Sequence, residues 1–232
     1  MEQKIYNLII LDESGSMQSI KAQAITGLNE TLQTIKSAQD KYENQIHYVS
    51  LVSFNSNDVK TIYDCCPVNR IKELSNKDYQ PSACTPLYDA MGMSLTKLKT
   101  EVKDEDNVLV TIITDGYENA SREYSGKAIA QLVEELKTKG WIFAYIGANQ
   151  DVEKVASSMG INNSLCFDAN EEGTRSMLRK ERESRRELYY CIDEGMDTMR
   201  LSEREYFGGN RVNSQKESSE KKEEKKKRWW WI

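Results

Sequence analysis

The chain has 232 residues, enough for one sizeable α/β domain and a further segment. A hydrophobic content of 38%, a charged content of 30% and a net charge of −5 fit a soluble protein and favour no nucleic-acid partner. No apolar run approaches the ~20 residues of a membrane-spanning helix, so we expect no membrane span. The N-terminus leads into a strand-like run without a signal-peptide cleavage site, which predicts a cytoplasmic location.

Apolar runs alternate with helical patterns along most of the chain. Strands are predicted, in chain order, over 6–11, 46–54, 59–65, 108–114, 141–146 and 164–167. Helices are predicted over 19–41, 86–103, 121–139, 151–158 and 171–192. Gly140 and Gly160 supply plausible stops after the third and fourth helices.

This alternation predicts an α/β fold of the Rossmann-like, doubly wound kind. The strands 6–11, 108–114 and 141–146 are nearly continuous apolar runs, which is typical of parallel strands covered on both faces. Residues 55–58 are too few for a crossover, so the second and third strands should form a hairpin. We therefore expect a mostly parallel six-stranded sheet with one antiparallel edge strand and helices on both faces.

The last part of the chain differs in composition. Residues 179–187, in the middle of the last predicted helix, include no large apolar side chain, so we expect them to be solvated while both helix ends pack. From Gly208 onward the sequence is polar and of low complexity, which predicts disorder. The terminal KKKRWWWI could bind a membrane surface, stack on nucleic acid, dock in a partner groove or have no function. The predicted organisation is a domain over 1–190 and a C-terminal extension over 191–232.

Polar side chains follow the strands whose carboxyl ends should meet at one edge of the sheet. Asp12, Ser14 and Ser16 follow the first strand, and Asp115 follows the fourth. Open α/β sheets bind ligands at this edge, near the point where the strand order reverses. With Thr85, which precedes a predicted helix, two carboxylates and three hydroxyls would converge. This oxygen set suits Mg²⁺ or Mn²⁺ better than Zn²⁺ or copper.

These residues resemble the metal-ion-dependent adhesion site of von Willebrand factor type A (VWA) domains. That site follows the pattern Asp-x-Ser-x-Ser, a distant Thr and a distant Asp. All five positions are filled in this order, by Asp12, Ser14, Ser16, Thr85 and Asp115. The stretches YQPSACTPLYDAMG and ITDGYENASREYS are similar to the cytosolic bacterial branch of the family, which includes proteins linked to tellurium-resistance operons. The resemblance covers roughly residues 4–188.

The resemblance implies a nucleotide-free domain that binds a protein partner through a divalent cation. It implies direct coordination by Ser14, Ser16 and Thr85, with Asp12 and Asp115 acting largely through water. Because the direct ligands are neutral hydroxyls, the cation would keep much of its charge, and an Asp or Glu of the partner could displace a bound water. Bacterial relatives tend to be adaptors, sometimes to ATPases or stress-response complexes. The expected function is therefore a non-enzymatic interaction module.

Several residues near the site leave alternatives open. Relatives often carry glycine just ahead of the threonine, where this chain has Ala83 and Cys84, so a stiffer loop is expected. Cys84 could be a redox-sensitive thiol, although a small loop residue is the better interpretation. Glu13 and Glu118 flank the site and could tune its charge, although solvated side chains are the better interpretation for both. The one histidine, His47, lies in a predicted strand and is better explained by packing than by catalysis.

Two other functions compete with the adaptor. A phosphatase of the haloacid-dehalogenase type also places an Asp after its first strand and uses Mg²⁺. It needs a second Asp two residues later, however, and that position is Ser14. A structural scaffold could keep the motif without the ion. Five cysteines without a Cys-x-x-Cys pair favour neither a zinc cluster nor a disulfide framework.

Overall fold

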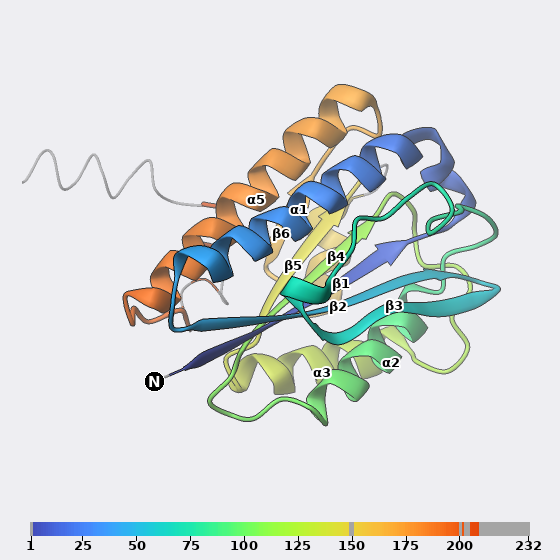
Figure 1. The fold of residues 1–232 in the computed structure, drawn as a ribbon. Coiled ribbons are helices and arrows are strands. Elements are labelled where there is room, and N and C mark those ends of the chain that lie inside the picture. The colour runs from blue at the N-terminus through green and yellow to red at the C-terminus, as the bar shows by residue number, and fades with distance from the viewer. Residues whose placement is uncertain (1, 149–150, 200, 202–204, 209–232) are drawn as a thin grey trace, which may run out of the picture.

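The computed structural model describes residues 2–148, 151–199, 201 and 205–208, and their strands form one six-stranded sheet between two layers of helices (Figure 1). The strands are β1 (Gln3–Asp12), β2 (Gln45–Asn55), β3 (Asp58–Pro67), β4 (Asn107–Thr114), β5 (Ile142–Gly147) and β6 (Asn163–Cys166). The α-helices are α1 (Lys21–Lys41), α2 (Leu87–Lys99), α3 (Gly126–Thr138), α4 (Val152–Ser158) and α5 (Glu171–Asp193). The strand order is β3-β2-β1-β4-β5-β6, and β3 is the antiparallel edge strand. The predicted fold class is confirmed.

The order of the strands reverses between β1 and β4, which pair in parallel at the centre of the sheet. Leu11 of β1 lies opposite Ile113 of β4, so both strands end at the same level. The residues that follow them, including Asp12 and Asp115, therefore lie at one edge of the sheet. This is the edge at which doubly wound sheets bind their ligands.

Helices α1 and α5 cover one face of the sheet, and α2 and α3 cover the other (Figure 1). Because successive strand residues point to opposite faces, β1 contributes to both cores. Ile9 and Leu11 belong to the core beneath α1 and α5, whereas Leu8 and Ile10 belong to the core above α2 and α3. Each fully buried side chain of this size stabilises the fold by about 1.5–3 kcal/mol.

The third predicted helix, over 121–139, begins five residues later than expected, at Gly126. Asp89 of α2 accepts hydrogen bonds from three successive backbone N–H groups, those of residues 122–124, at 2.8–2.9 Å. This contact bends the chain before the helix, and Ser125 then caps the first turn by accepting from the Ala128 N–H. All other ends of predicted strands and α-helices lie within four residues of the observed ones.

One face of the middle of α5 is buried, so the expectation that the whole of residues 179–187 is solvated was wrong in part. The Arg185 side chain is 0% exposed and the Glu181 side chain 1%. All five N–H groups of the guanidinium donate hydrogen bonds of 2.6–3.2 Å, to Glu181 Oε1 (from Nε and Nη2), Asn7 Oδ1, Tyr189 OH and Thr111 Oγ1. Asn7 lies on β1 and Thr111 on β4, so the sheet itself supplies polar partners to the helix. These partners allow a charged stretch to pack without large apolar side chains.

Several sequence expectations concern the end of the chain. The polar segment after Gly208 and the KKKRWWWI terminus lie outside the described residues. The core continues beyond residue 190, because Ile192, Leu201 and Tyr206 are buried in it. Within the described residues, no helix is both long enough and apolar enough to cross a membrane.

Candidate metal centre

The turn after β1 brings the first three candidate residues together. Asp12 is the last residue of β1, and its Oδ1 accepts a hydrogen bond from the Ser14 backbone N–H at 2.7 Å. Gly15 and Ser16 open a short 3-10 helix, Gly15–Ile20, which leads into α1. The hydroxyls of Ser14 and Ser16 are 3.1 Å apart. The motif therefore forms one compact turn rather than separate helix caps.

The end of β4 joins this turn through two further hydrogen bonds. Thr114 Oγ1 donates to Asp12 Oδ2 at 2.6 Å, and Ser16 Oγ donates to Asp115 Oδ1 at 2.5 Å. Because the Ser16 proton goes to Asp115, the Ser14 hydroxyl must be the donor to Ser16. Both serine protons are thus directed within the cluster, and lone pairs on the hydroxyl oxygens stay available for a cation.

Thr85 reaches the same cluster from the loop before α2. A Cβ placed on Gly116 would lie 3.3 Å from Thr85 Oγ1 and 3.6 Å from Ser16 Oγ. The Thr85 and Ser16 hydroxyls therefore both lie next to Gly116, the residue after Asp115. The structure brings all five predicted residues to one place. They come from three chain segments that are more than 25 residues apart in sequence.

Burial determines the electrostatics of the two carboxylates. Burial raises the pKa of Asp12 to about 6, although hydrogen bonds from Thr114 and Ser14 lower it and the nearby Asp115 charge raises it further. Burial also raises the pKa of Asp115, while the hydrogen bond from Ser16 lowers it. A divalent cation among these oxygens would favour the charged form of both groups.

The donor set fits a hard cation. Among the described residues, no group of three or more His, Cys, Asp or Glu side chains could hold a metal. A metal centre at this edge would therefore depend on hydroxyls together with only two carboxylates. Mg²⁺ and Mn²⁺ prefer oxygen ligands, and Mg²⁺ usually keeps several waters, so Ser14, Ser16 and Thr85 with water could complete its shell.

Three neighbours support the turn, and sequence reasoning assigned this role to none of them: Thr114, Tyr79 and Glu13. Thr114 donates to the Asp12 carboxylate. The buried Tyr79 donates its hydroxyl to the Asp12 carbonyl at 2.5 Å. Glu13 is buried and its Oε1 accepts from the Gln80 N–H, which corrects the expectation that it faces solvent. Glu118 is also not free in solvent, because its carboxylate accepts hydrogen bonds from the N–H groups of Tyr88, Ala120 and Ser121. The polar residue directly before Asp115 is a local signal that could have identified Thr114.

The loop ahead of Thr85 keeps a backbone conformation that favours glycine. Ala83 has φ +62°, in the left-handed region, and its carbonyl accepts the Gly15 N–H at 3.1 Å. The exposed Cys84 is held by bonds between its backbone and Ser56. The loop thus reaches the site with alanine where relatives often have glycine, at the cost of strain at one residue.

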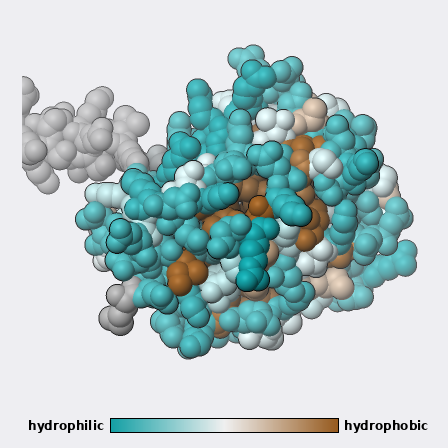
Figure 2. Space-filling model, in the orientation of Figure 1, coloured by the Kyte–Doolittle hydropathy of each residue, from teal (hydrophilic) through white to brown (hydrophobic). Residues whose placement is uncertain are grey.

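The surroundings leave the cluster accessible from one side. Ser16 is exposed, whereas Asp12, Ser14, Thr85 and Asp115 are buried. Tyr117, two residues after Asp115, is 54% exposed. The surface in Figure 2 is mostly hydrophilic, with separate hydrophobic areas between polar side chains. At the site itself, Ser16 is the candidate residue that reaches the surface.

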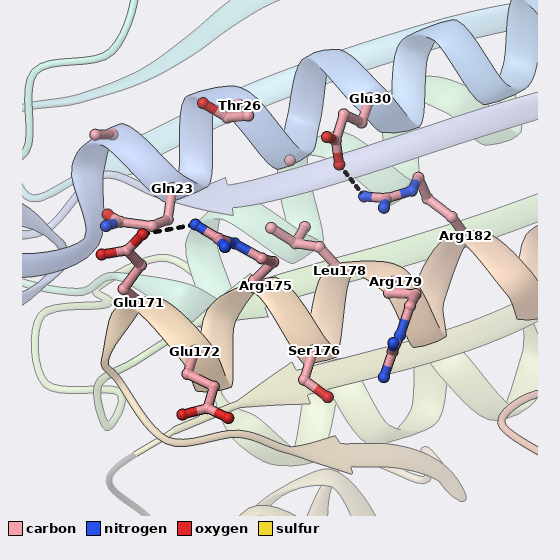
Figure 3. A pocket seen from close by; sticks show the side chains of 12 residues that line it. Gln23, Thr26, Glu30, Glu171, Glu172, Arg175, Ser176, Leu178, Arg179 and Arg182 are labelled. Atoms are coloured by element: carbon pink, nitrogen blue, oxygen red, sulfur yellow. Dashed lines mark hydrogen bonds and ion pairs between the residues drawn. The ribbon is translucent and has the colours of Figure 1, made fainter.

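A groove of about 650 Å³ lies between α1 and α5 (Figure 3). None of its lining residues belongs to the candidate site. Its charges largely pair with one another, since Arg182 contacts Glu30 across the groove and Arg175 contacts Glu171 along α5.

His47 has a packing role, separate from the candidate site. It is buried, and its ring packs edge-on against Tyr189.

The fold has counterparts among known proteins. Similar solved structures include the PilB minor pilin from Streptococcus sanguinis, at 14% identity and a TM-score of 0.56 over 85% of this chain and 63% of that chain. They also include the open conformation of the pilus adhesin SpaC from Lactobacillus rhamnosus GG, at 13% identity and a TM-score of 0.60 over 81% of this chain and 30% of that chain. The SpRpn10 VWA domain is similar at 8% identity and a TM-score of 0.52, over 78% of this chain and 95% of that chain.

These identities show a shared fold alone, and the chain spans less than two thirds of the pilin and about a third of the adhesin. No curated protein matches the sequence. The family model of the von Willebrand factor type A domain matches residues 8–180, well over half of the chain. The chain therefore belongs to the von Willebrand factor type A domain family.

Proposed function

We propose that this VWA domain is a non-enzymatic interaction module that binds an acidic side chain of a protein partner through Mg²⁺ or Mn²⁺. Ser14, Ser16 and Thr85 would hold the cation directly, and Asp12 and Asp115 would act largely through water. The convergence of these five side chains at the ends of β1 and β4 carries the proposal. VWA domains are typically protein-interaction modules, which supports the assignment.

The charges of the site explain why an acidic partner group would bind. Three neutral hydroxyls would leave the cation with most of its positive charge. The two carboxylates are engaged by hydroxyl protons, Asp12 with Thr114 and Asp115 with Ser16. The exposed Ser16 marks the side from which an Asp or Glu could displace a bound water. No group in this arrangement is needed to move a proton or to attack a substrate.

The proposed cellular location and class of partner rest on the resemblance in sequence. The motif around Thr85 and the one after Asp115 favour the cytosolic bacterial branch linked to tellurium resistance. We therefore propose a cytoplasmic adaptor whose partner is an ATPase or a stress-response complex. SpaC is a pilus adhesin, and its likeness to this chain extends to the fold alone.

Metal binding is tested by thermal unfolding and titration calorimetry of the purified chain with Mg²⁺, Mn²⁺ and EDTA. At one hundred times the dissociation constant, a bound ion stabilises the fold by about 2.7 kcal/mol, which raises the Tm by roughly 5–10 °C. Asp12→Asn and Ser14→Ala should abolish the shift. Ser37→Ala, which alters an exposed serine on α1, should keep it. No heat and no shift for the wild type would favour a metal-free scaffold.

Partner binding is tested by affinity capture from lysate with and without EDTA, read by mass spectrometry. We expect specific partners that are lost with EDTA, with Asp12→Asn and with Ser14→Ala. Unchanged capture under all three conditions would refute the proposed function. Hydrolysis of generic phosphate esters with Mg²⁺, lost in Asp12→Asn, would instead favour the phosphatase.

A further inference from the structure

The first turn of α2 is capped by a distant loop rather than by its own N-cap residue. The N-cap residue is Pro86, whose side chain has no hydrogen-bonding group. Glu118 Oε2 accepts the Tyr88 N–H at 2.9 Å, and Ser121 Oγ accepts the Asp89 N–H at 3.1 Å. The loop after β4 thus supplies the missing acceptors.

Glu118 also holds its own loop in shape. Its Oε1 accepts the N–H groups of Ala120 and Ser121 at 2.8 and 2.7 Å, and its Oε2 accepts the Ser121 hydroxyl at 2.7 Å. The Asp89 carboxylate binds the next part of the loop in return. The segment 85–89, which begins with the candidate ligand Thr85, and the segment 118–124 therefore form one reciprocal set of contacts.

Asn119 makes the contact of this set that reaches a candidate ligand. Its side-chain Oδ1 accepts the Thr85 N–H at 2.9 Å, and its own N–H donates to the Thr85 carbonyl at 3.1 Å. Both backbone polar groups of Thr85 are thus held by one residue. Glu118 and Ser121 have no such contact with Thr85 among the described hydrogen bonds.

We propose that Asn119 is a positioning residue that fixes the Thr85 hydroxyl and so sets the cation affinity of the metal centre. The inference rests on the proposed function, because Thr85 is taken to be a ligand. The loop ahead of Thr85 is anchored through the backbones of Ala83 and Cys84, to Gly15 and Ser56, whereas the backbone of Thr85 itself bonds to Asn119. Asn119 thus ties Thr85 to the segment that carries Asp115. Partners that orient a metal ligand typically change metal affinity by about 10–100-fold when they are removed.

The test is a Mn²⁺ titration of the full chain, followed by calorimetry and by electron paramagnetic resonance of the free and bound ion. Asn119→Ala should weaken binding by about tenfold. Thr85→Ala should also weaken it, and the double variant should be no weaker than Thr85→Ala, because Asn119 acts only through Thr85. Asn119→Asp keeps the acceptor for the Thr85 N–H and should bind Mn²⁺ at least as tightly as the wild type.

Ser121→Ala is the matched control within the same loop. It removes the acceptor of the Asp89 N–H without touching Thr85, so it should lower the Tm and leave the Mn²⁺ affinity within about twofold of the wild type. The inference is overturned if Asn119→Ala binds like the wild type, if its effect adds fully to that of Thr85→Ala, or if Asn119→Asp fails to restore binding. A wild-type chain that binds no Mn²⁺ would overturn the proposed function and this inference with it.

Discussion

Replacing Arg185 by methionine should destabilise the protein far more than the same change at an exposed arginine of the same helix. Arg185→Met keeps most of the side-chain volume and removes the charge. Among the described residues, the buried Glu181 carboxylate is then left with two weak donors, the Tyr206 hydroxyl at 3.4 Å and the Thr31 hydroxyl at 3.5 Å. Removing one partner of a buried ion pair typically costs about 3–5 kcal/mol, because the other charge stays buried and uncompensated.

Arg175 provides the control, because it forms the same kind of pair at the surface. Arg175 Nη2 lies 2.6 Å from Glu171 Oε1, and Arg185 Nη2 lies 2.6 Å from Glu181 Oε1, both four residues apart on α5. The two pairs differ in burial, and exposed pairs contribute about 0–1 kcal/mol. Arg175→Met should therefore be nearly neutral. The comparison separates the effect of burial from that of helical position.

The assay is urea unfolding at pH 7, followed by far-ultraviolet circular dichroism. With a slope of about 2 kcal/mol per molar urea, a loss of 4 kcal/mol lowers the midpoint by about 2 M. A double variant, Glu181→Leu with Arg185→Met, should recover most of the loss, because apolar residues of similar volume can replace a buried pair. The reasoning fails if Arg185→Met costs no more than Arg175→Met, or if the double variant is as unstable as Arg185→Met alone.

Two further predictions concern His47 and Ala83. Burial, assisted by the nearby Arg185 charge, lowers the pKa of His47 from 6.5 to about 3, so the unfolded chain binds a proton between these values and the folded chain does not. Stability should therefore fall by about 2 kcal/mol from pH 7 to pH 5, and His47→Phe should lose this contribution, as measured by urea unfolding at both pH values. Ala83→Gly should stabilise the fold by about 0.5–1 kcal/mol, because relief of left-handed strain exceeds the entropy cost of glycine.

Each of these predictions has a result that contradicts it. Asp12 titrates with the opposite sign, because its pKa is raised, but it is present in both proteins and cancels in the comparison of wild type with His47→Phe. An equal pH dependence of the two proteins would show that His47 keeps its proton when folded. The control for Ala83→Gly is Ala120→Gly, in the loop after β4, because Ala120 has no positive φ. This control should lower the free energy of unfolding by about 0.5–1 kcal/mol. Equal effects of the two glycine variants would exclude strain at Ala83.

Much of the candidate site could be predicted because its residues follow two strands of a parallel sheet. The turn from Asp12 to Ser16 is local, and the position of Asp115 follows from the pairing of β1 with β4. The partners that hold these residues could not be predicted in the same way. Thr114 is 102 residues from Asp12, and Tyr79 is 67 residues from it. Periodicity carries no information on such pairs.

The sequence by itself determined the order of strands and helices along the chain, the antiparallel hairpin and the residues of the metal motif. These features depend on local patterns of apolar and polar side chains. Only the tertiary structure decided which charges are buried. The charged middle of α5 looks solvated when Arg185 is read beside its sequence neighbours. Arg185 is nevertheless buried, because Asn7 and Thr111, on two central strands, accept hydrogen bonds from a guanidinium that would otherwise require water.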